Sequence, residues 1–227
     1  MHGNPNRSGF GRSTLSSEPL IIVGAGGHGR ETAHAFLLDH AEQDFLGFLD
    51  DDGAPSTPEG WPILGPINLW REHRHARFII AVNDPRTRRS VVARMCAGGE
   101  PRWTALVHPD VRLHKSVRHG VGCMFLGGCQ LTTNIRLGDH CIINRSAQIG
   151  HDCAVGNFVS MNPLACVAGR VRIGHGCELG SACSIRQLVS IGNGATIGMG
   201  AVVVKHAADN RVMVGNPARE LKELVPW

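Results

Sequence analysis

The chain has 227 residues, 42% of them apolar and 19% charged, with 29 glycines, no tyrosine and a net charge of +4. This length suits two small domains with an aliphatic core, and the scattered basic residues do not indicate nucleic-acid binding. No apolar stretch approaches the roughly 20 residues of a membrane span. Residues 1–18 lack the apolar middle of a signal peptide, so we expect a disordered extension on a cytoplasmic protein with reduced thiols.

Residues 19–103 alternate strand and helix patterns. Apolar runs at 20–23, 45–49 and 76–82 predict three strands, and helical spacing follows in residues 28–40 and 85–99. This order predicts an α/β domain of βαβαβα type (Rossmann-like) with a parallel sheet.

A glycine-rich loop follows the first predicted strand. The sequence GAGGHG at residues 24–29 precedes a helix, and Asp50, Asp51 and Asp52 end the second strand about twenty residues later. Backbone N–H groups at such a helix start can bind phosphate. The domain is smaller than the usual two-half dinucleotide fold. Alternatively, the glycines only permit a tight turn and the acids only solvate a strand end.

Residues 104–206 follow a six-residue repeat. An apolar residue recurs at every sixth position from Val107 to Val203, interrupted only by His119, and a small residue follows four positions later. This repeat predicts a β-helix in which three hexads form one triangular coil. Residues 18 apart should therefore stack on one another, with both recurrent positions pointing into the prism.

The repeat also accounts for most cysteines. Six of the eight fall at the small inward position, and we expect them to be buried: Cys123, Cys129, Cys141, Cys153, Cys177 and Cys183. Cys96 and Cys166 have no assigned role. There is no C-x-x-C pair, so we expect no metal site.

His151 and Asp152 point outward from this repeat. Gly169 lies 18 residues after His151, which predicts a gap on the outer wall where a thioester could lie. A histidine with an adjacent acid can act as a general base, and N–H groups near Gly169 could stabilise a developing oxyanion. Cys153 points inward and is a poor nucleophile. Four other outward histidines are expected to be solvated only: His108, His114, His140 and His175.

The chain resembles the bacterial nucleotide-sugar acetyltransferases, which include sialic-acid O-acetyltransferases and N-acetyltransferases of 4-amino-4,6-dideoxy sugars. The motifs are VGAGGHGRE, FLDDD, INRSAQIGHDCAVGNF, VAGRVRIG, GMGAVVVK and VGNPA. The resemblance implies a left-handed parallel β-helix of hexapeptide repeats over residues 104–206. It also implies a homotrimer with acetyl-CoA between adjacent prisms.

The resemblance further implies roles for individual residues. The general base is His151, supported by Asp152, with Asn144 reaching the centre from the neighbouring chain. Acetyl-CoA contacts are implied at Gly169, Ser181, Met199, Ser160, Lys205, Gly215 and Pro217, with residues 207–227 as a tail covering this site. Nucleotide-sugar contacts are implied at Gly26, Gly27, His28, Asp50, Asp51 and Asn83. The chain departs from the family pattern at Ser160, where some members have a histidine, and at Val82, where glycine is frequent.

We therefore expect an acetyl-CoA-dependent N-acetyltransferase acting on a nucleotide-linked 4-amino-4,6-dideoxy sugar, without a metal. The first alternative is O-acetylation of a sialic-acid-like sugar. A second is a hexapeptide-type carbonic anhydrase, for which His114 and His119 lack an evident third zinc ligand. A third is a non-catalytic trimer that binds a sugar nucleotide.

Overall fold

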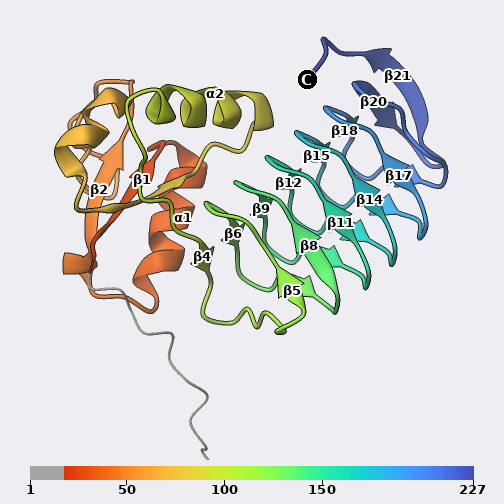
Figure 1. Ribbon diagram of the computed structural model, residues 1–227, viewed down its shortest axis with the longest axis horizontal. Coiled ribbons are helices and arrows are strands. Elements are labelled where there is room, and N and C mark those ends of the chain that lie inside the picture. Colours follow the sequence, from red (N-terminus) through yellow and green to blue (C-terminus); the bar gives the residue numbers. More distant parts are fainter. Residues whose placement is uncertain (1–17) are drawn as a thin grey trace, which may run out of the picture.

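The computed structural model describes residues 18–227, which form an α/β unit followed by a parallel β-helix (Figure 1). The predicted fold class is thereby confirmed in both parts. The disordered extension expected over residues 1–18 lies, apart from Glu18, outside the described residues. Within residues 18–227, no helix has the length and apolar character needed to cross a membrane.

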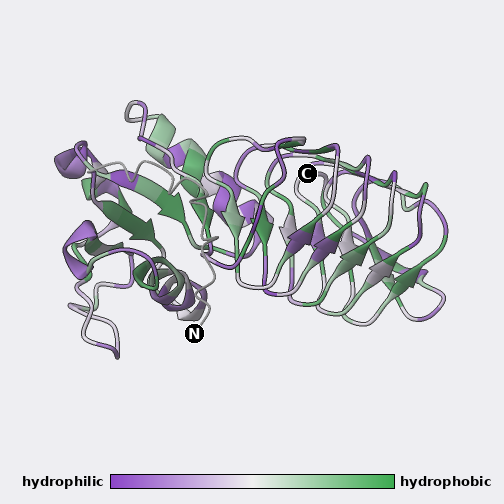
Figure 2. Cartoon of the chain, turned by 90° about the horizontal axis from the view of Figure 1, so that it is seen from below, coloured by the Kyte–Doolittle hydropathy of each residue, from purple (hydrophilic) through white to green (hydrophobic). Residues whose placement is uncertain are grey.

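The α/β unit contains a three-stranded parallel sheet in the order β2-β1-β3. Its strands are β1 (Leu20–Val23), β2 (Phe45–Leu49) and β3 (Arg77–Ile80), and its helices are α1 (Gly27–Leu37) and α2 (Pro85–Cys96). Two 3-10 helices, η1 (Glu42–Asp44) and η2 (Ile67–His73), complete the unit. The sheet strands are strongly hydrophobic (Figure 2) because both of their faces are covered.

One helix of the expected βαβαβα pattern is not an α-helix. The connection between β2 and β3 carries only the 3-10 helix η2. Prolines and glycines crowd the segment before it, at Pro55, Pro58, Gly60, Pro62, Gly65 and Pro66. These residues disfavour a longer helix. By contrast, α2 starts sharply, with Asp84 accepting a hydrogen bond from the Thr87 N–H at 2.6 Å and Pro85 at the first helical position.

The β-helix has three faces, and the stacked strands within each face pair in parallel. The first face contains β7 (Gln130–Leu131), β10 (Gln148–Ile149), β13 (Cys166–Val167), β16 (Ser184–Ile185) and β19 (Val202–Val203). The second contains β5 (Val117–Arg118), β8 (Ile135–Leu137), β11 (Ala154–Val155), β14 (Arg172–Ile173) and β17 (Ser190–Ile191). The third contains β4 (Leu106–Val107), β6 (Met124–Phe125), β9 (Ile142–Ile143), β12 (Ser160–Met161), β15 (Glu178–Leu179), β18 (Thr196–Ile197), β20 (Arg211–Val214) and the antiparallel β21 (Arg219–Glu223).

Three rows of turns join these faces. The first corner is the row of turns at 133–134, 151–152 and 169–170. The second corner is the row at 139–140, 157–158 and 175–176. The third corner is the row at 145–146, 163–164, 181–182 and 199–200. From β4 to β19, paired residues lie 18 positions apart, as when Gln148 pairs with Cys166. In the last coil the spacing is 16, since Thr196 of β18 pairs with Val212 of β20. The predicted stacking by 18 is therefore confirmed.

The interior follows the repeat except at its open end. The six cysteines predicted to point inward are buried. Val107 is 41% exposed, however, and His119 is exposed as well. The prediction that Val107 fills the prism is wrong, because Val107 belongs to the first turn of the prism, where the interior is incomplete. The ring of His119, which interrupts the repeat, contacts the interior Phe125 at 5.2 Å from this open end.

The α/β unit packs on the third face. Leu106, Met124 and Ile142 of this face share a core with Leu20 and Phe48 of the α/β unit. The expectation that His140 is solvated is wrong: it is 4% exposed. Its ring stacks on Phe158 at 5.3 Å and meets Trp103 edge-on at 4.9 Å. Burial lowers the pKa of His140 to about 4.

Arg88 of α2 joins the two units. Its buried guanidinium donates to four carbonyl oxygens and one hydroxyl, which belong to Val82, Asn83, His140, Phe158 and Ser160. Burial among these neutral acceptors lowers the pKa of Arg88 to about 10. Every acceptor on the β-helix side lies on the third face or beside it, so Arg88 fixes the α/β unit to that face.

The C-terminal segment returns to α2 (Figure 1). The Trp227 ring lies 4.8 Å from the Arg89 guanidinium and 5.5 Å from that of Arg86, while its backbone N–H donates to Asn210 at 2.8 Å. The tail over residues 207–227 was expected to cover the CoA site. That role stays a prediction. The last residue, Trp227, lies against α2 and the second corner, beside Phe158 and Gly176.

Candidate active site

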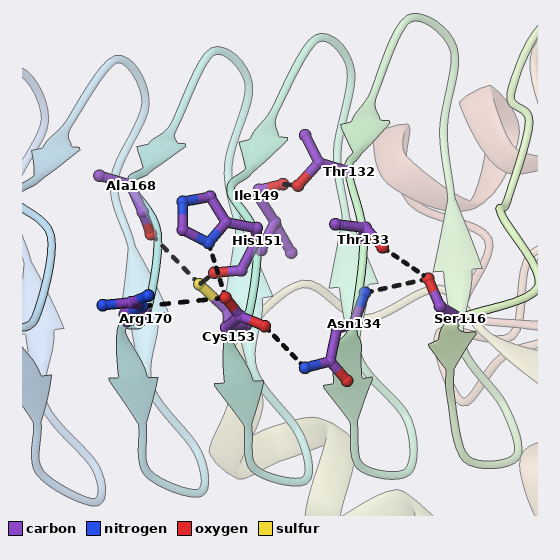
Figure 3. Close-up of polar contacts among 10 residues, drawn as sticks. Ser116, Thr132, Thr133, Asn134, Ile149, His151, Cys153, Ala168 and Arg170 are labelled. Atoms are coloured by element: carbon purple, nitrogen blue, oxygen red, sulfur yellow. Dashed lines mark hydrogen bonds and ion pairs between the residues drawn. The ribbon is translucent and has the colours of Figure 1, made fainter.

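The candidate general base lies at the first corner. His151 follows β10, and its Nδ1 lies 2.7 Å from Asp152 Oδ2 (Figure 3). Asp152 adopts a φ of 61°, as the second residue of each turn in this corner does, and this backbone brings its carboxylate beside the ring. About half of the His151 side chain is exposed. With Nδ1 donating to the carboxylate, Nε2 is left as the proton acceptor.

Gly169 lies directly against the imidazole. A Cβ atom at residue 169 would be 2.5 Å from His151 Nε2 and 2.7 Å from Cε1. The sequence predicted that Gly169 leaves an open gap for a thioester. The structure corrects this interpretation, since the histidine ring itself occupies the space that the missing side chain leaves.

Asn134, which no sequence motif indicated, positions Asp152. Its Nδ2 donates to Asp152 Oδ1 at 2.6 Å, and its backbone N–H is held by Ser116 Oγ at 3.0 Å (Figure 3). Hydrogen bonds from His151 and Asn134 lower the pKa of Asp152. Asn134 precedes Asp152 by 18 residues, so the stacking arithmetic could have identified it.

Cys153 is turned away from this site. Its Sγ donates to the Ala168 carbonyl at 3.2 Å, and burial raises the pKa of the thiol. A buried thiol with a raised pKa is a poor nucleophile, so its position agrees with the sequence prediction.

The glycine loop forms the second part of the candidate site. Asp50 Oδ2 accepts from the Ala25 N–H at 2.6 Å and thereby shapes the loop before α1. Gly26 and Gly27 are exposed, and a Cβ atom on either would meet nothing within 4 Å. No side chain caps the start of α1, so its first N–H groups face outward. The open glycines and the uncapped N–H groups at the start of α1 favour the binding of an anion there.

Two buried polar atoms lie near this loop without hydrogen-bond partners among the described residues, namely His28 Nε2 and Asn83 Oδ1. Burial lowers the pKa of His28. Asn83 Nδ2 donates to Asn162 Oδ1 at 2.8 Å, which places the loop after β3 against the third corner. A bound ligand could supply the missing partners.

Asp51 does not join Asp50 at the loop. Its Oδ1 accepts from the Ile67 N–H at 3.0 Å and its Oδ2 pairs with Arg94 at 2.6 Å. Partial burial opposes ionisation, but the bonds from Arg94 and Ile67 outweigh it and lower the pKa of Asp51. Both oxygens are therefore already used to attach η2 and α2 to the end of β2.

The remaining predicted residues are spread over the prism. Asn144 is 6% exposed and leads into the third corner, where its Oδ1 accepts from the Arg145 N–H at 2.8 Å. Ser181 and Met199 also lie at the third corner, and Met199 is 79% exposed. Lys205 and Gly215 are exposed near the end of the prism. Pro217 follows Asn216 through a cis peptide bond. One chain therefore places His151 and Gly169 at one corner and Asn144, Ser181 and Met199 at another.

The structure does not support the predicted contact of Ser160 with acetyl-CoA. It has no exposed surface, its Oγ donates to the Asn83 carbonyl, and it accepts from Arg88 at 2.9 Å. A side chain enclosed between the two units cannot contact a ligand bound outside, so we leave it out of the acetyl-CoA site.

Residues 18–227 contain no group of three or more His, Cys, Asp and Glu side chains arranged to hold a metal ion. His114 Nδ1 instead contacts Ser116 Oγ at 2.8 Å, and His119 Nδ1 contacts the Gly120 carbonyl at 2.8 Å.

Comparison with known proteins identifies both units. Residues 19–95 match the PglD N-terminal domain. Over 156 residues, 66% of this chain, the sequence is 31% identical to GDP-perosamine N-acetyltransferase of Escherichia coli O157:H7, of which 70% is covered.

Two solved structures extend the similarity over most of the chain. The acetyltransferase domain of PglB from Neisseria gonorrhoeae FA1090, in complex with acetyl coenzyme A, has 31% identity and a TM-score of 0.83, covering 91% of this chain and 100% of that chain. PerB from Caulobacter crescentus, in complex with CoA and GDP-perosamine, has 27% identity and a TM-score of 0.82. The match covers 92% of this chain and 100% of that chain. The chain therefore belongs to the nucleotide-sugar acetyltransferases of the left-handed β-helix type, a family of acetyl-CoA-dependent enzymes.

Proposed function

We propose that this protein transfers the acetyl group of acetyl-CoA to the amine of a nucleotide-linked 4-amino-4,6-dideoxy sugar, with His151 as the general base. The observation that carries the proposal is the 2.7 Å contact between His151 Nδ1 and Asp152 Oδ2, which leaves Nε2 free as an acceptor on an exposed corner. The relatives that act on or bind GDP-perosamine support the choice of an amino sugar.

The reaction needs one proton transfer and no covalent enzyme intermediate. The neutral amine attacks the thioester carbonyl while His151 Nε2 accepts a proton from the nitrogen. Asp152 stabilises the imidazolium that forms, and Asn134 holds the carboxylate in place. The new C–N bond replaces the C–S bond, and CoA leaves as a thiolate that recovers the proton. The N–H of Gly169 would donate to the carbonyl oxygen as charge develops, since the neighbouring N–H groups of Ala168 and Arg170 are already bound to the Ile185 and His151 carbonyls.

The proposed active centre lies between subunits of a homotrimer. The first corner supplies His151, Asp152 and Gly169, and the third corner of a neighbouring chain would supply Asn144, Ser181 and Met199. The exposed apolar surface of Met199 and the exposed ammonium of Lys205 fit an acyl donor that carries an apolar arm and phosphates. The glycine loop, His28, Asp50 and Asn83 would hold the nucleotide sugar.

Replacing the base tests the mechanism. We expect His151→Ala to lower kcat by about 10²- to 10⁴-fold, as for loss of a general base, while its affinity for acetyl-CoA is unchanged. Stopped assays of thiol release and calorimetric titration with acetyl-CoA measure the two quantities. Normal turnover by this variant would show that His151 is not the base.

An acceptor panel tests the substrate class. UDP-, GDP- and dTDP-linked 4-amino-4,6-dideoxy sugars should release CoA thiol, whereas their 4-hydroxy counterparts should not. Release with a sialic acid and with no amine would identify the protein as an O-acetyltransferase. Tight binding of the nucleotide sugars without thiol release from any acceptor would indicate a non-catalytic binding protein.

A further inference from the structure

An ion pair crosses the seam between the two units beside the glycine loop. Arg145 Nη1 at the third corner lies 3.0 Å from Glu31 Oε1 of α1. Both side chains are about half exposed, at 53% and 45%. The pair forms one wall of a surface pocket that His34, His108 and Leu126 also line, so the guanidinium has room to turn.

Arg145 is a cation of the β-helix that can move toward a ligand at this place. Two guanidinium groups, those of Arg88 and Arg145, act electrostatically on His28 at the start of α1. Arg88 is buried and its N–H groups are bound to carbonyls and a hydroxyl. Arg145 is half exposed and is held by one carboxylate, while its backbone N–H is fixed by Asn144.

The surroundings of the loop favour an incoming anion. The first turn of α1 contains no acidic residue, Gly26 and Gly27 are open to solvent, and His28 Nε2 is buried without a partner in the described chain. Glu31, one turn further along α1, holds Arg145 within reach of this open end. An exposed ion pair contributes little stability, whereas a diphosphate offers a guanidinium several charge-assisted hydrogen bonds.

Resting on the proposed function, we propose that Arg145 binds the diphosphate of the nucleotide sugar, and that Glu31 occupies the guanidinium until the substrate displaces it. Glu31 thus acts as an internal competitor of the diphosphate. Arg145 is then a substrate-binding residue supplied by the β-helix to a site otherwise built by the α/β unit.

Calorimetric titration with GDP, UDP and dTDP tests this inference. Arg145→Ala should weaken binding of the preferred nucleoside diphosphate by about 10- to 100-fold, as expected when hydrogen bonds to a charged group are lost. Arg145→Lys should retain part of the affinity, because it keeps the charge without the planar fork. Glu31→Gln should tighten binding by about two- to fivefold. Arg172→Ala on β14, with the same charge change on the second face, serves as the matched control and should bind normally.

Kinetics provide a second readout. Arg145→Ala should raise the KM for the nucleotide amino sugar, with kcat at saturation and the KM for acetyl-CoA unchanged. If Arg145→Ala and Glu31→Gln both bind the nucleotide like the parent protein, the inference is wrong while the proposed function stands. If the parent protein binds none of the three nucleoside diphosphates, the nucleotide-sugar substrate itself is refuted, and the inference falls with it.

Discussion

At residue 169, the absence of a side chain decides where the His151 ring can lie. The ring rests against the Gly169 backbone with Nδ1 bound to Asp152, and Asp152 is in turn bound to Asn134. Three consecutive coils therefore build one column: Asn134 comes from the first, the hydrogen-bonded pair His151 and Asp152 from the second, and Gly169, which packs against the ring, from the third. The stacked backbones restrict the motion of the ring, which is the preorganisation that a general base needs.

Replacing Gly169 by alanine should displace this ring. A Cβ atom 2.5 Å from Nε2 cannot be accommodated without rotation of the imidazole, and a shift of about 1 Å can reduce kcat by about 10²-fold. The Tm should change little, because the corner is solvent-exposed. Steady-state kinetics together with thermal unfolding measure both effects. Full activity in Gly169→Ala would mean that the position of the ring seen here is not the working one.

At the scale of elements, the first strands of the third face of the β-helix are specialised for contact with the α/β unit. The outward residues of these strands, Leu106, Met124 and Ile142, are buried because the α/β unit covers them, and Arg88 of α2 satisfies the carbonyl groups at this contact. His140 belongs to the same contact and is buried in a neutral form. A buried histidine with a lowered pKa makes the stability of this contact depend on pH.

The sign of this dependence follows from the two pKa values. His140 titrates at about 4 when folded and at about 6.5 when unfolded. Between these values the unfolded chain binds more protons, so stability is fully present above pH 6.5 and falls as the pH decreases toward 4. The contribution is about 1.4 kcal/mol for each pH unit.

Substituting phenylalanine removes this titration. His140→Phe retains the ring that stacks on Phe158, and we expect the free energy of unfolding to depend less steeply on pH between 6.5 and 4. Urea unfolding at a series of pH values measures the slope for both proteins. Equal slopes in the variant and the parent would exclude His140 as a source of acid sensitivity. His114→Phe, at the exposed side chain that contacts Ser116, provides the comparison.

For the whole molecule, the separation of the candidate residues onto two corners is the main constraint. His151 lies at the first corner and Asn144 leads into the third, so a single prism cannot bring them together. A closed trimer would bring the first corner of one chain to the third corner of the next. In such an assembly, Met199, which is exposed in one chain, would be covered by the neighbouring chain.

Mixed trimers test this arrangement. His151→Ala and Asn144→Ala should each be inactive alone. When the two variants are unfolded and refolded together, some sites should combine an intact His151 from one chain with an intact Asn144 from another, and thiol release should partly return. Size-exclusion chromatography with light scattering measures whether the refolded mixture is a trimer. No recovery in a correctly assembled mixed trimer would place both residues in the same chain's site.

The hexad phase was enough to predict the interior, the corners and the residues that stack, because the repeat is local and each coil lies directly on the previous one. It therefore identified His151, Asp152 and Gly169 as neighbours, and it could have identified Asn134. It could not show which outward face would be covered. The burial of His140 and Ser160 depends on contacts with Arg88 across 52 and 72 residues of sequence.

The sequence by itself determined the two kinds of unit and the column of residues around His151, since both follow from short periodic patterns that dictate backbone geometry. Only the tertiary structure decided that the α/β unit packs on the third face, that Asp51 binds Arg94, and that Arg145 meets Glu31 beside the glycine loop. These contacts join surfaces that lie far apart in the chain. Their formation depends on the fit of whole faces, which no local periodicity encodes.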